Sequence, residues 1–171
     1  SQAYVKSPLE IPFLRRKVRY VLDQAGFPPE SHAGKSLLNV LETFPRDELF
    51  QIGAGDLADW SMAILDLDLR PRVRVFPRVD RFDRFVSVLV YAPRDRYSTR
   101  VREQIGNYLA TVFKGYITAF YPYSPEGQLV RVHFIVGRTD GATPQVPAET
   151  LERDVAALVK TWQDRLAETL E

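Results

Sequence analysis

Apolar residues recur every three or four positions through the first 70 residues, which is the spacing of amphipathic helices. One such stripe covers residues 14–25 and stops at a glycine followed by two prolines, and a second covers residues 37–44. A third stripe covers residues 57–67 and starts after a glycine-rich entry, where Asp56 is the expected N-cap. The pattern therefore predicts a helical segment over residues 1–70.

Alternation of apolar and polar residues replaces the helical period after this segment. Valines alternate with arginines over residues 72–76, and we expect Pro71 and Pro77 to bound a strand there. Residues 85–91 are apolar almost throughout, which is typical of a central strand covered on both faces. A polar turn and an amphipathic helix follow this central strand.

The later part of the chain completes the pattern. Ser98 or Thr99 is placed to cap the helix that follows the turn, and Lys114-Gly115 is placed to end it. Two strands and one long helix then follow, over residues 116–123, 130–136 and 148–171.

These elements predict an α+β fold, in which a helical layer (residues 1–70) packs on an ACT-like or ferredoxin-like antiparallel sheet with helices on one face (residues 71–171). The final strand of a ferredoxin-like unit is missing after the last helix, and the strand at 72–76 could occupy its edge. Trp60 and the stripe around it need an apolar partner, so we expect the helical segment to pack on the sheet.

Composition excludes several kinds of chemistry. There are no cysteines, so disulfides, thiol nucleophiles and cysteine-type zinc sites are excluded, and two isolated histidines predict no metal site. No apolar run approaches the roughly 20 residues of a membrane span, and the first residues lack a secretory core, so we expect a cytoplasmic protein without membrane contact. The absence of an initial methionine suggests an excised fragment.

Net charge is +1, but ten arginines face only three acidic residues over positions 70–102. Such an excess could attract phosphates or carboxylates, although a solvated surface or one facing other domains explains it more simply. No RNP-like aromatic pair or helix-turn-helix spacing accompanies it, so nucleic-acid binding is not predicted.

No catalytic residue is predicted. Gly34-Lys35-Ser36 lacks the earlier glycine of a phosphate loop, and the glycines at 53 and 55 suit a helix entry better than a dinucleotide fingerprint. His133 lies within a strand without Ser, Cys or carboxylate neighbours in sequence, which favours a hydrogen-bonded structural histidine over a catalytic base.

The turn over residues 93–99 is the best candidate for binding. It leaves the end of a central strand and opens a helix, so it presents backbone N–H groups. Arg94, Arg96, Ser98 and Thr99 add donors suited to the carboxylate of an amino acid. The alternative is an ordinary capped strand-to-helix connection.

Several runs resemble the N-terminal region of the large bacterial NAD-specific glutamate dehydrogenases. They are residues 11–17, 38–51, 85–97 and 131–136. The phrases ETFPRDELFQ at 42–51 and VYAPRDRY at 90–97 are the most specific parts of these runs. In that family this region precedes the catalytic domain and contains ACT-like modules, a fold often used to sense amino acids. The resemblance implies that the whole protein oxidatively deaminates L-glutamate to 2-oxoglutarate with NAD, whereas this piece is not catalytic and holds no cofactor.

Two hypotheses follow for this piece. It is either a sensor whose amino-acid effector binds near residues 94–99, or a structural domain that mediates contacts between subunits or domains. Its expected partners are the remaining domains of the same polypeptide, further subunits of a homo-oligomer and a small amino-acid effector.

Overall fold

The computed structural model describes residues 6–160 of the chain. The chain divides into two compact units, Ser1–Arg70 and Pro71–Glu171. None of the helices within the described residues combines the length and apolar character that a membrane span requires.

The first unit is helical, as predicted. Its elements are η1 (Pro8–Glu10), α2 (Pro12–Ala25), α3 (His32–Thr43), α4 (Arg46–Gln51) and α5 (Ala54–Asp66). Helix α4 was not predicted, although Pro45 at its start and two acidic residues in its first turn are helix-start signals. The prediction that Asp56 caps α5 is wrong, because Gly53 is the N-cap. Asp56 lies in the first turn, where its negative charge interacts favourably with the helix dipole.

Packing in this unit joins the helices around a small apolar core. Helix α2 ends at Gly26, whose φ of 69° is a left-handed conformation that glycine adopts without strain. The Lys17 Nζ donates to the Leu49 carbonyl at 2.7 Å and to the Phe50 carbonyl at 3.2 Å. A side chain of α2 thus supplies hydrogen bonds to carbonyls at the C-terminal end of α4. Trp60 is half-buried with its ring centroid 6.4 Å from that of Phe44. The packing of this unit on the sheet stays a prediction.

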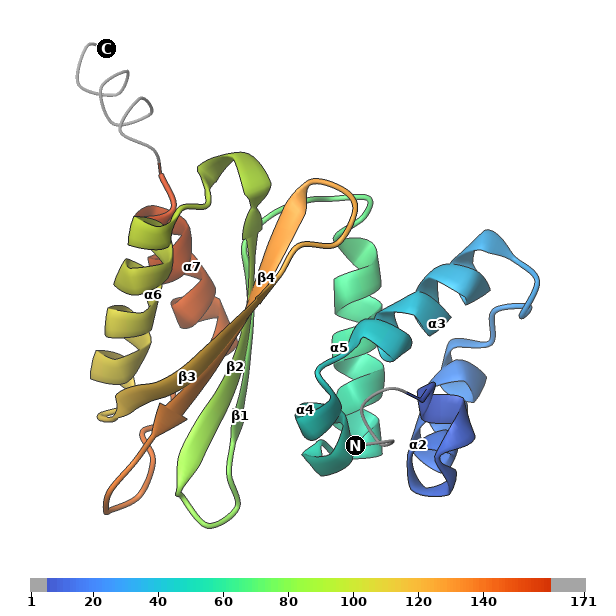
Figure 1. Ribbon diagram of the computed structural model, residues 1–171, viewed down its shortest axis with the longest axis horizontal. Coiled ribbons are helices and arrows are strands. Elements are labelled where there is room, and N and C mark those ends of the chain that lie inside the picture. Colours follow the sequence, from blue (N-terminus) through green and yellow to red (C-terminus); the bar gives the residue numbers. More distant parts are fainter. Residues whose placement is uncertain (1–5, 161–171) are drawn as a thin grey trace. The chain divides into compact units, whose positions relative to one another are not determined.

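The second unit is a four-stranded sheet with two main helices and one short turn. Its elements are β1 (Arg74–Val79), β2 (Phe85–Pro93), η2 (Arg94–Arg96), α6 (Thr99–Val112), β3 (Tyr116–Tyr123), β4 (Leu129–Gly137) and α7 (Ala148–Leu158). The strand order is β1-β2-β4-β3, and every neighbouring pair is antiparallel. Figure 1 shows α6 and α7 on the same face of this sheet. The α+β prediction is confirmed, and β1 takes the edge beside β2 that the missing final strand would have filled.

The edge position of β1 explains a wrong strand boundary. Pro77 lies inside β1, opposite Val88, and does not end the strand. Proline lacks an N–H group, which an edge strand tolerates because one side of it has no partner strand. Helix α7 also covers this edge, because Glu152 Oε2 accepts the Val75 N–H at 3.0 Å and the Arg74 Nε–H at 2.5 Å.

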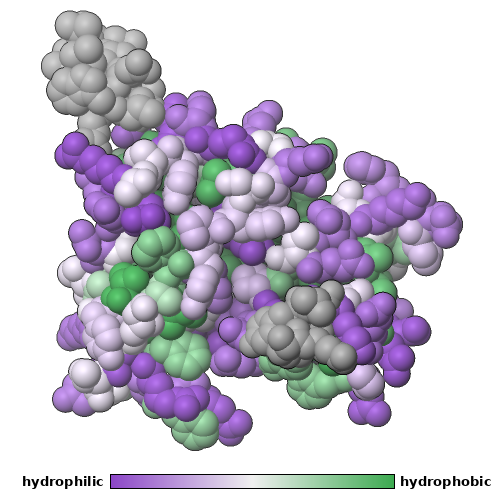
Figure 2. All heavy atoms as spheres, in the orientation of Figure 1, coloured by the Kyte–Doolittle hydropathy of each residue, from purple (hydrophilic) through white to green (hydrophobic). Residues whose placement is uncertain are grey.

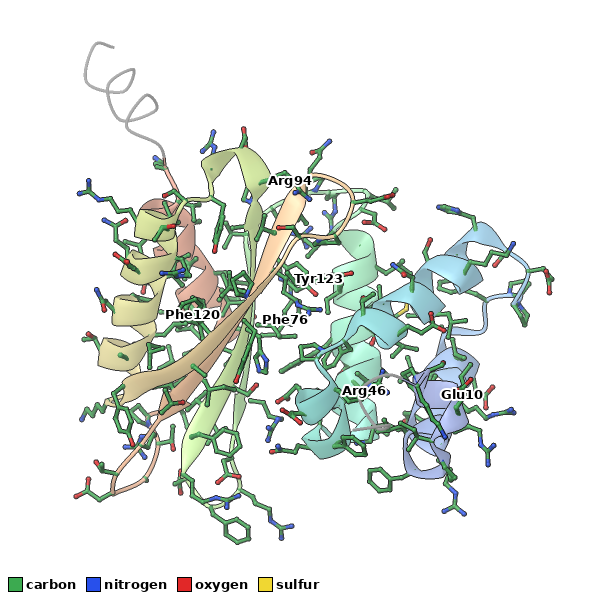
Figure 3. The ribbon with its side chains drawn as sticks, viewed as in Figure 1. Glu10, Arg46, Phe76, Arg94, Phe120 and Tyr123 are labelled. Carbon is green, nitrogen blue, oxygen red and sulfur yellow. The ribbon has the colours of Figure 1, made fainter. Side chains whose placement is uncertain are left out.

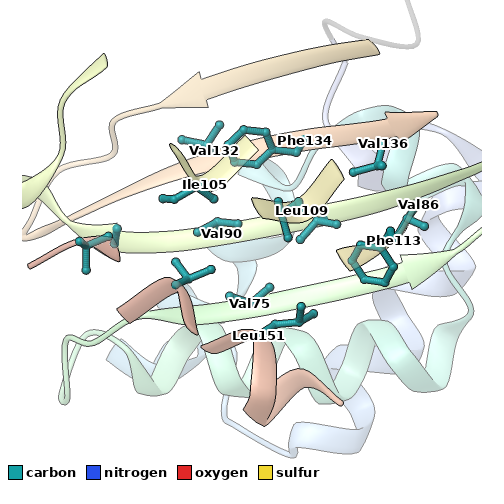
Figure 4. Packing of buried hydrophobic residues seen from close by; sticks show 14 of the residues in the cluster. Val75, Val86, Val90, Ile105, Leu109, Phe113, Val132, Phe134, Val136 and Leu151 are labelled. Atoms are coloured by element: carbon teal, nitrogen blue, oxygen red, sulfur yellow. The ribbon is translucent and has the colours of Figure 1, made fainter. Parts of the chain in front are cut away.

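The core of this unit lies between the sheet and the two helices (Figure 4). The interior residues of β2, from Val86 to Ala92, are all buried, as expected for a central strand. Phe134 of β4 is 1% exposed. Helix α6 approaches it closely at Gly106, where an added Cβ would lie 3.4 Å from the Phe134 ring. On the outer side, the Tyr108 hydroxyl donates to Asp154 at 2.6 Å and joins α6 to α7, and burial raises the pKa of Tyr108.

Both ends of α6 agree with the prediction. Ser98 caps its start, and Lys114-Gly115 forms its stop directly after Val112 and the C-cap. Lys114 has a left-handed φ of 54°, its N–H donates to the Thr111 carbonyl, and the Gly115 N–H donates to the Ala110 carbonyl. Position 115 requires glycine, because a Cβ there would lie 2.2 Å from the Gly137 carbonyl oxygen. Helix α7 covers residues 148–158, and the rest of the helix predicted to reach residue 171 lies outside the described residues.

Candidate effector-binding loop

The loop between β2 and α6 carries the four residues predicted to bind an effector. It begins with η2 and ends with the cap of α6. Arg94, Ser98 and Thr99 are exposed, whereas Arg96 is half-buried. Figure 3 shows Arg94 at one end of the sheet, near the turn over residues 124–128 that joins β3 to β4. Arg94 and Arg96 thus lie in η2, Ser98 is the N-cap of α6, and Thr99 is the first residue of that helix.

Arg94 ties this loop to the β3–β4 turn. Its backbone N–H donates to the Gln128 carbonyl at 2.7 Å, and its Nε–H donates to the Gly127 carbonyl at 3.1 Å. A terminal nitrogen of the guanidinium donates to the Pro125 carbonyl. These bonds span more than 30 positions of sequence, so the first role of Arg94 is to hold two turns together.

Ser98 and Thr99 form the start of α6. The Ser98 Oγ accepts the Val101 N–H at 3.1 Å, and the Ser98 carbonyl accepts the Arg102 N–H at 3.0 Å. The first N–H groups of a helix have no partner within the helix, and the helix dipole makes this end favourable for negative charge. Thr99 and Arg100 therefore offer backbone donors beside their exposed side chains. Chemically, the loop can present donors to a carboxylate, while Ser98 shapes its backbone.

A buried arginine lies at the same end of the sheet. Arg131 of β4 pairs with Tyr91 of β2, and its guanidinium carbon lies 4.6 Å from the ring centroid of Tyr123. Burial raises the pKa of Tyr91, and the positive charge of Arg131 acts in the opposite direction. Arg131 was not among the predicted site residues. The signal for it was a cation within a mostly apolar strand.

A second cation–aromatic pair lies between α6 and the outer strand. The guanidinium carbon of Arg102 is 4.0 Å from the ring centroid of Phe120, which is 40% exposed (Figure 3). Such pairs contribute about 0.5–1 kcal/mol at exposed sites. The contact joins α6 to β3, whose register with β4 places Phe120 opposite Phe134.

His133 is hydrogen-bonded, as predicted for a structural histidine. Its Nε2 lies 2.7 Å from the Ser87 Oγ, and both side chains are buried. A serine beside a histidine is also the pairing of a nucleophile with its base. Burial of both groups denies a substrate access, so the pair cross-links β2 and β4.

Metal binding finds no support in the described part of the chain. Over residues 6–160, no three His, Asp or Glu side chains lie close enough together to hold a metal ion.

Two family models match the chain, and together they cover most of it. The ACT2 domain of glutamate dehydrogenase matches residues 74–163, and helical motif 1 of glutamate dehydrogenase matches residues 11–70. The first match covers the sheet unit and the second covers the helical unit.

Three curated relatives are named NAD-specific glutamate dehydrogenase. The protein from Halomonas elongata is 42% identical over 164 residues, which are 95% of this chain and 10% of that protein. The protein from Pseudomonas aeruginosa is 37% identical over 96% of this chain and 10% of its own length. The protein from Mycobacterium tuberculosis is 38% identical over 92% of this chain and 10% of its own length.

The chain thus spans about a tenth of the length of the relatives it matches. The resemblance noted in the sequence is confirmed over both units, by the two family models and by relatives well above 30% identity. The chain belongs to the glutamate dehydrogenase family, of which it carries helical motif 1 and the ACT2 domain.

Proposed function

We propose that this chain is a non-catalytic regulatory and assembly part of an NAD-dependent glutamate dehydrogenase. The full-length enzyme would oxidatively deaminate L-glutamate to 2-oxoglutarate. The observation that carries the proposal is the match of both units to an ACT2 domain and a helical motif, within relatives about ten times longer. The remaining nine-tenths of such an enzyme would then carry out the dehydrogenase chemistry.

Regulation would work through the loop between β2 and α6. An effector can shift an enzyme between two conformations only if it binds one of them better than the other. The loop is fixed at one end by Arg94 and at the other by Ser98. The Arg96 guanidinium, between these anchors, and the N–H groups at the start of α6, just after Ser98, would hold the carboxylate of an amino acid.

Titration of the purified chain with each of the twenty amino acids by calorimetry tests this role. One amino acid should bind in the millimolar range or better. Arg94→Ala/Arg96→Ala should weaken it about tenfold or more, because a charge-assisted hydrogen bond contributes about 1.5–3 kcal/mol and each 1.4 kcal/mol is tenfold in affinity. Arg96→Ala alone should show most of the loss, because the Arg94 guanidinium already donates to carbonyls of the β3–β4 turn and contributes less to a ligand.

Arg81→Ala is the matched control, because Arg81 is an exposed arginine in the β1–β2 turn and not in this loop. It should leave the affinity unchanged. Absence of binding by any amino acid would contradict autonomous sensing, and unchanged binding by the double variant would place the pocket elsewhere.

A purely architectural role is the second candidate, and the two edges of the sheet favour it. The β1 edge is covered by Glu152 and contains Pro77. The opposite edge strand, β3, has no charged residue and exposes several aromatic side chains, namely Tyr116, Phe120, Tyr121 and Tyr123. Figure 2 shows apolar atoms on the surface over α6 and β3. An edge strand without charged residues and with exposed aromatic side chains suits contact with another domain or subunit.

A further inference from the structure

The turn between β1 and β2 presents an exposed phenylalanine flanked by arginines. Phe82 at its tip is 66% exposed, and Arg81 and Arg84 are also exposed. Their guanidinium carbons lie 5.2 Å and 5.3 Å from the ring centroid of Phe82. Single exposed apolar side chains are common on protein surfaces, so the informative feature is the combination of this ring with two arginines.

Asp80 makes the turn rigid from inside. Its Oδ2 accepts the N–H of Phe82 at 3.2 Å, the N–H of Arg84 at 3.1 Å and the Nε–H of Arg84 at 2.8 Å. Its Oδ1 accepts a second guanidinium bond from Arg84 at 3.2 Å. The carboxylate is only 4% exposed, and the hydrogen bond from Arg84 lowers its pKa from 3.8 to about 2. These hydrogen bonds restrain the backbone of the turn.

Asp83 fixes the other side of the turn. Its φ is 57°, a left-handed conformation that is unusual for a residue with a side chain. The carboxylate accepts the Thr143 N–H at 3.0 Å and the Thr143 hydroxyl at 2.5 Å, which ties the turn to the loop after β4. Arg138 anchors that loop in turn, since it donates to Thr143 at 3.1 Å and to the Phe113 carbonyl at 3.0 Å.

The negative charge of Asp80 is buried, whereas the positive charges of the turn are exposed. The Asp80 carboxylate points inward to backbone N–H groups, while the side chain of Arg84 that pairs with it is 66% exposed. A partner approaching the tip would therefore meet an apolar ring and guanidinium groups. Aromatic residues and arginine dominate the energetics of protein interfaces, and a preorganised segment loses less entropy on binding.

We propose that the β1–β2 tip, with Phe82 as its anchor, docks into an apolar hollow rimmed by carboxylates on the remaining polypeptide of the enzyme. This rests on the proposed function, in which the chain is part of a larger dehydrogenase. The relatives are about ten times longer than this chain, so most of such an enzyme lies outside it. The positive charges around Phe82 favour carboxylates on the surface that receives the tip. Two guanidinium groups already lie over the Phe82 ring, which disfavours stacking of a nucleic-acid base on it.

Photo-crosslinking in the full-length enzyme tests the docking. Phe82 is replaced by p-benzoylphenylalanine, the sample is irradiated, and crosslinked peptides are identified by mass spectrometry. The expected product joins residue 82 to a peptide outside this chain that contains Asp or Glu beside apolar residues. The same probe at Phe13 is the control, because Phe13 is 60% exposed and has Lys17 over its ring at 5.2 Å. It should give a different peptide or none.

Charge variants of Arg81 test whether carboxylates surround the docking site. Arg81→Glu should lower the crosslink yield at position 82 several-fold, whereas Arg81→Lys should retain most of it. An unchanged yield with Arg81→Glu would overturn the rim. The docking itself is overturned by crosslinks that stay within this chain, that reach only nucleic acid or lipid, or that do not form. An enzyme preparation without NADH formation would instead refute the proposed function, whatever the crosslink shows.

Discussion

Phe134→Ala is expected to lower the free energy of unfolding of the sheet unit by about 3–5 kcal/mol, the usual cost of truncating a fully buried phenylalanine. The ring is 1% exposed and belongs to the core between the sheet and its helices. Helix α6 already lies close to this ring, because Gly106 has no side chain to hold the helix away from it. The helix therefore has little room to move further inward. The cavity left by alanine should therefore stay largely unfilled.

Urea denaturation followed by circular dichroism measures this loss. Phe82→Ala is the matched control: the same substitution at a ring that is 66% exposed should cost less than about 1 kcal/mol, mainly for the lost cation–aromatic contacts. Equal losses at both positions would contradict the assignment of Phe134 to the core.

Asp80→Asn should destabilise the chain at neutral pH and much less in acid. The lowered pKa of Asp80, about 2 against 3.8, means that the folded state favours the carboxylate. Its stabilising contribution is therefore complete above pH 3.8 and disappears as the pH falls through about 2. Because Arg84 is exposed and its charge is screened by solvent, we expect the contribution to be on the order of 1 kcal/mol.

Melting temperatures of wild type and Asp80→Asn, measured between neutral pH and the acid limit of folding, check the sign. The two curves should converge as the pH falls. Asp95→Asn, at an exposed position of η2, serves as the control and should leave the curve parallel to wild type. A difference between Asp80→Asn and wild type that grows in acid would refute the role assigned to this carboxylate.

Local signals in the sequence predicted the elements well, and long-range pairing accounts for the errors. The glycine at 26 and the serine at 98 end or start their helices through their own backbone and side chain, so sequence suffices there. Pro77 is different. Whether a proline ends a strand or lies within it depends on which side of the strand has a partner, and β1 acquires its partner only when the sheet forms.

The candidate loop could be located from sequence, but its internal contacts could not. Arg94 looks the same in sequence whether it binds a ligand or a distant carbonyl, and its partners lie more than 30 positions away. Arg131 lies in a strand that the sequence predicts, yet its position beside Tyr91 and Tyr123 depends on the strand register. The rigid β1–β2 turn likewise depends on Thr143, 60 positions after Asp83.

NADH formation from L-glutamate and NAD, followed by absorbance, tests most directly whether this chain serves dehydrogenase chemistry only as part of a larger enzyme. We expect the full-length protein to form NADH, and the purified chain alone to give the rate of a no-protein control. NADH formation by the purified chain above that control would contradict its assignment as a non-catalytic part.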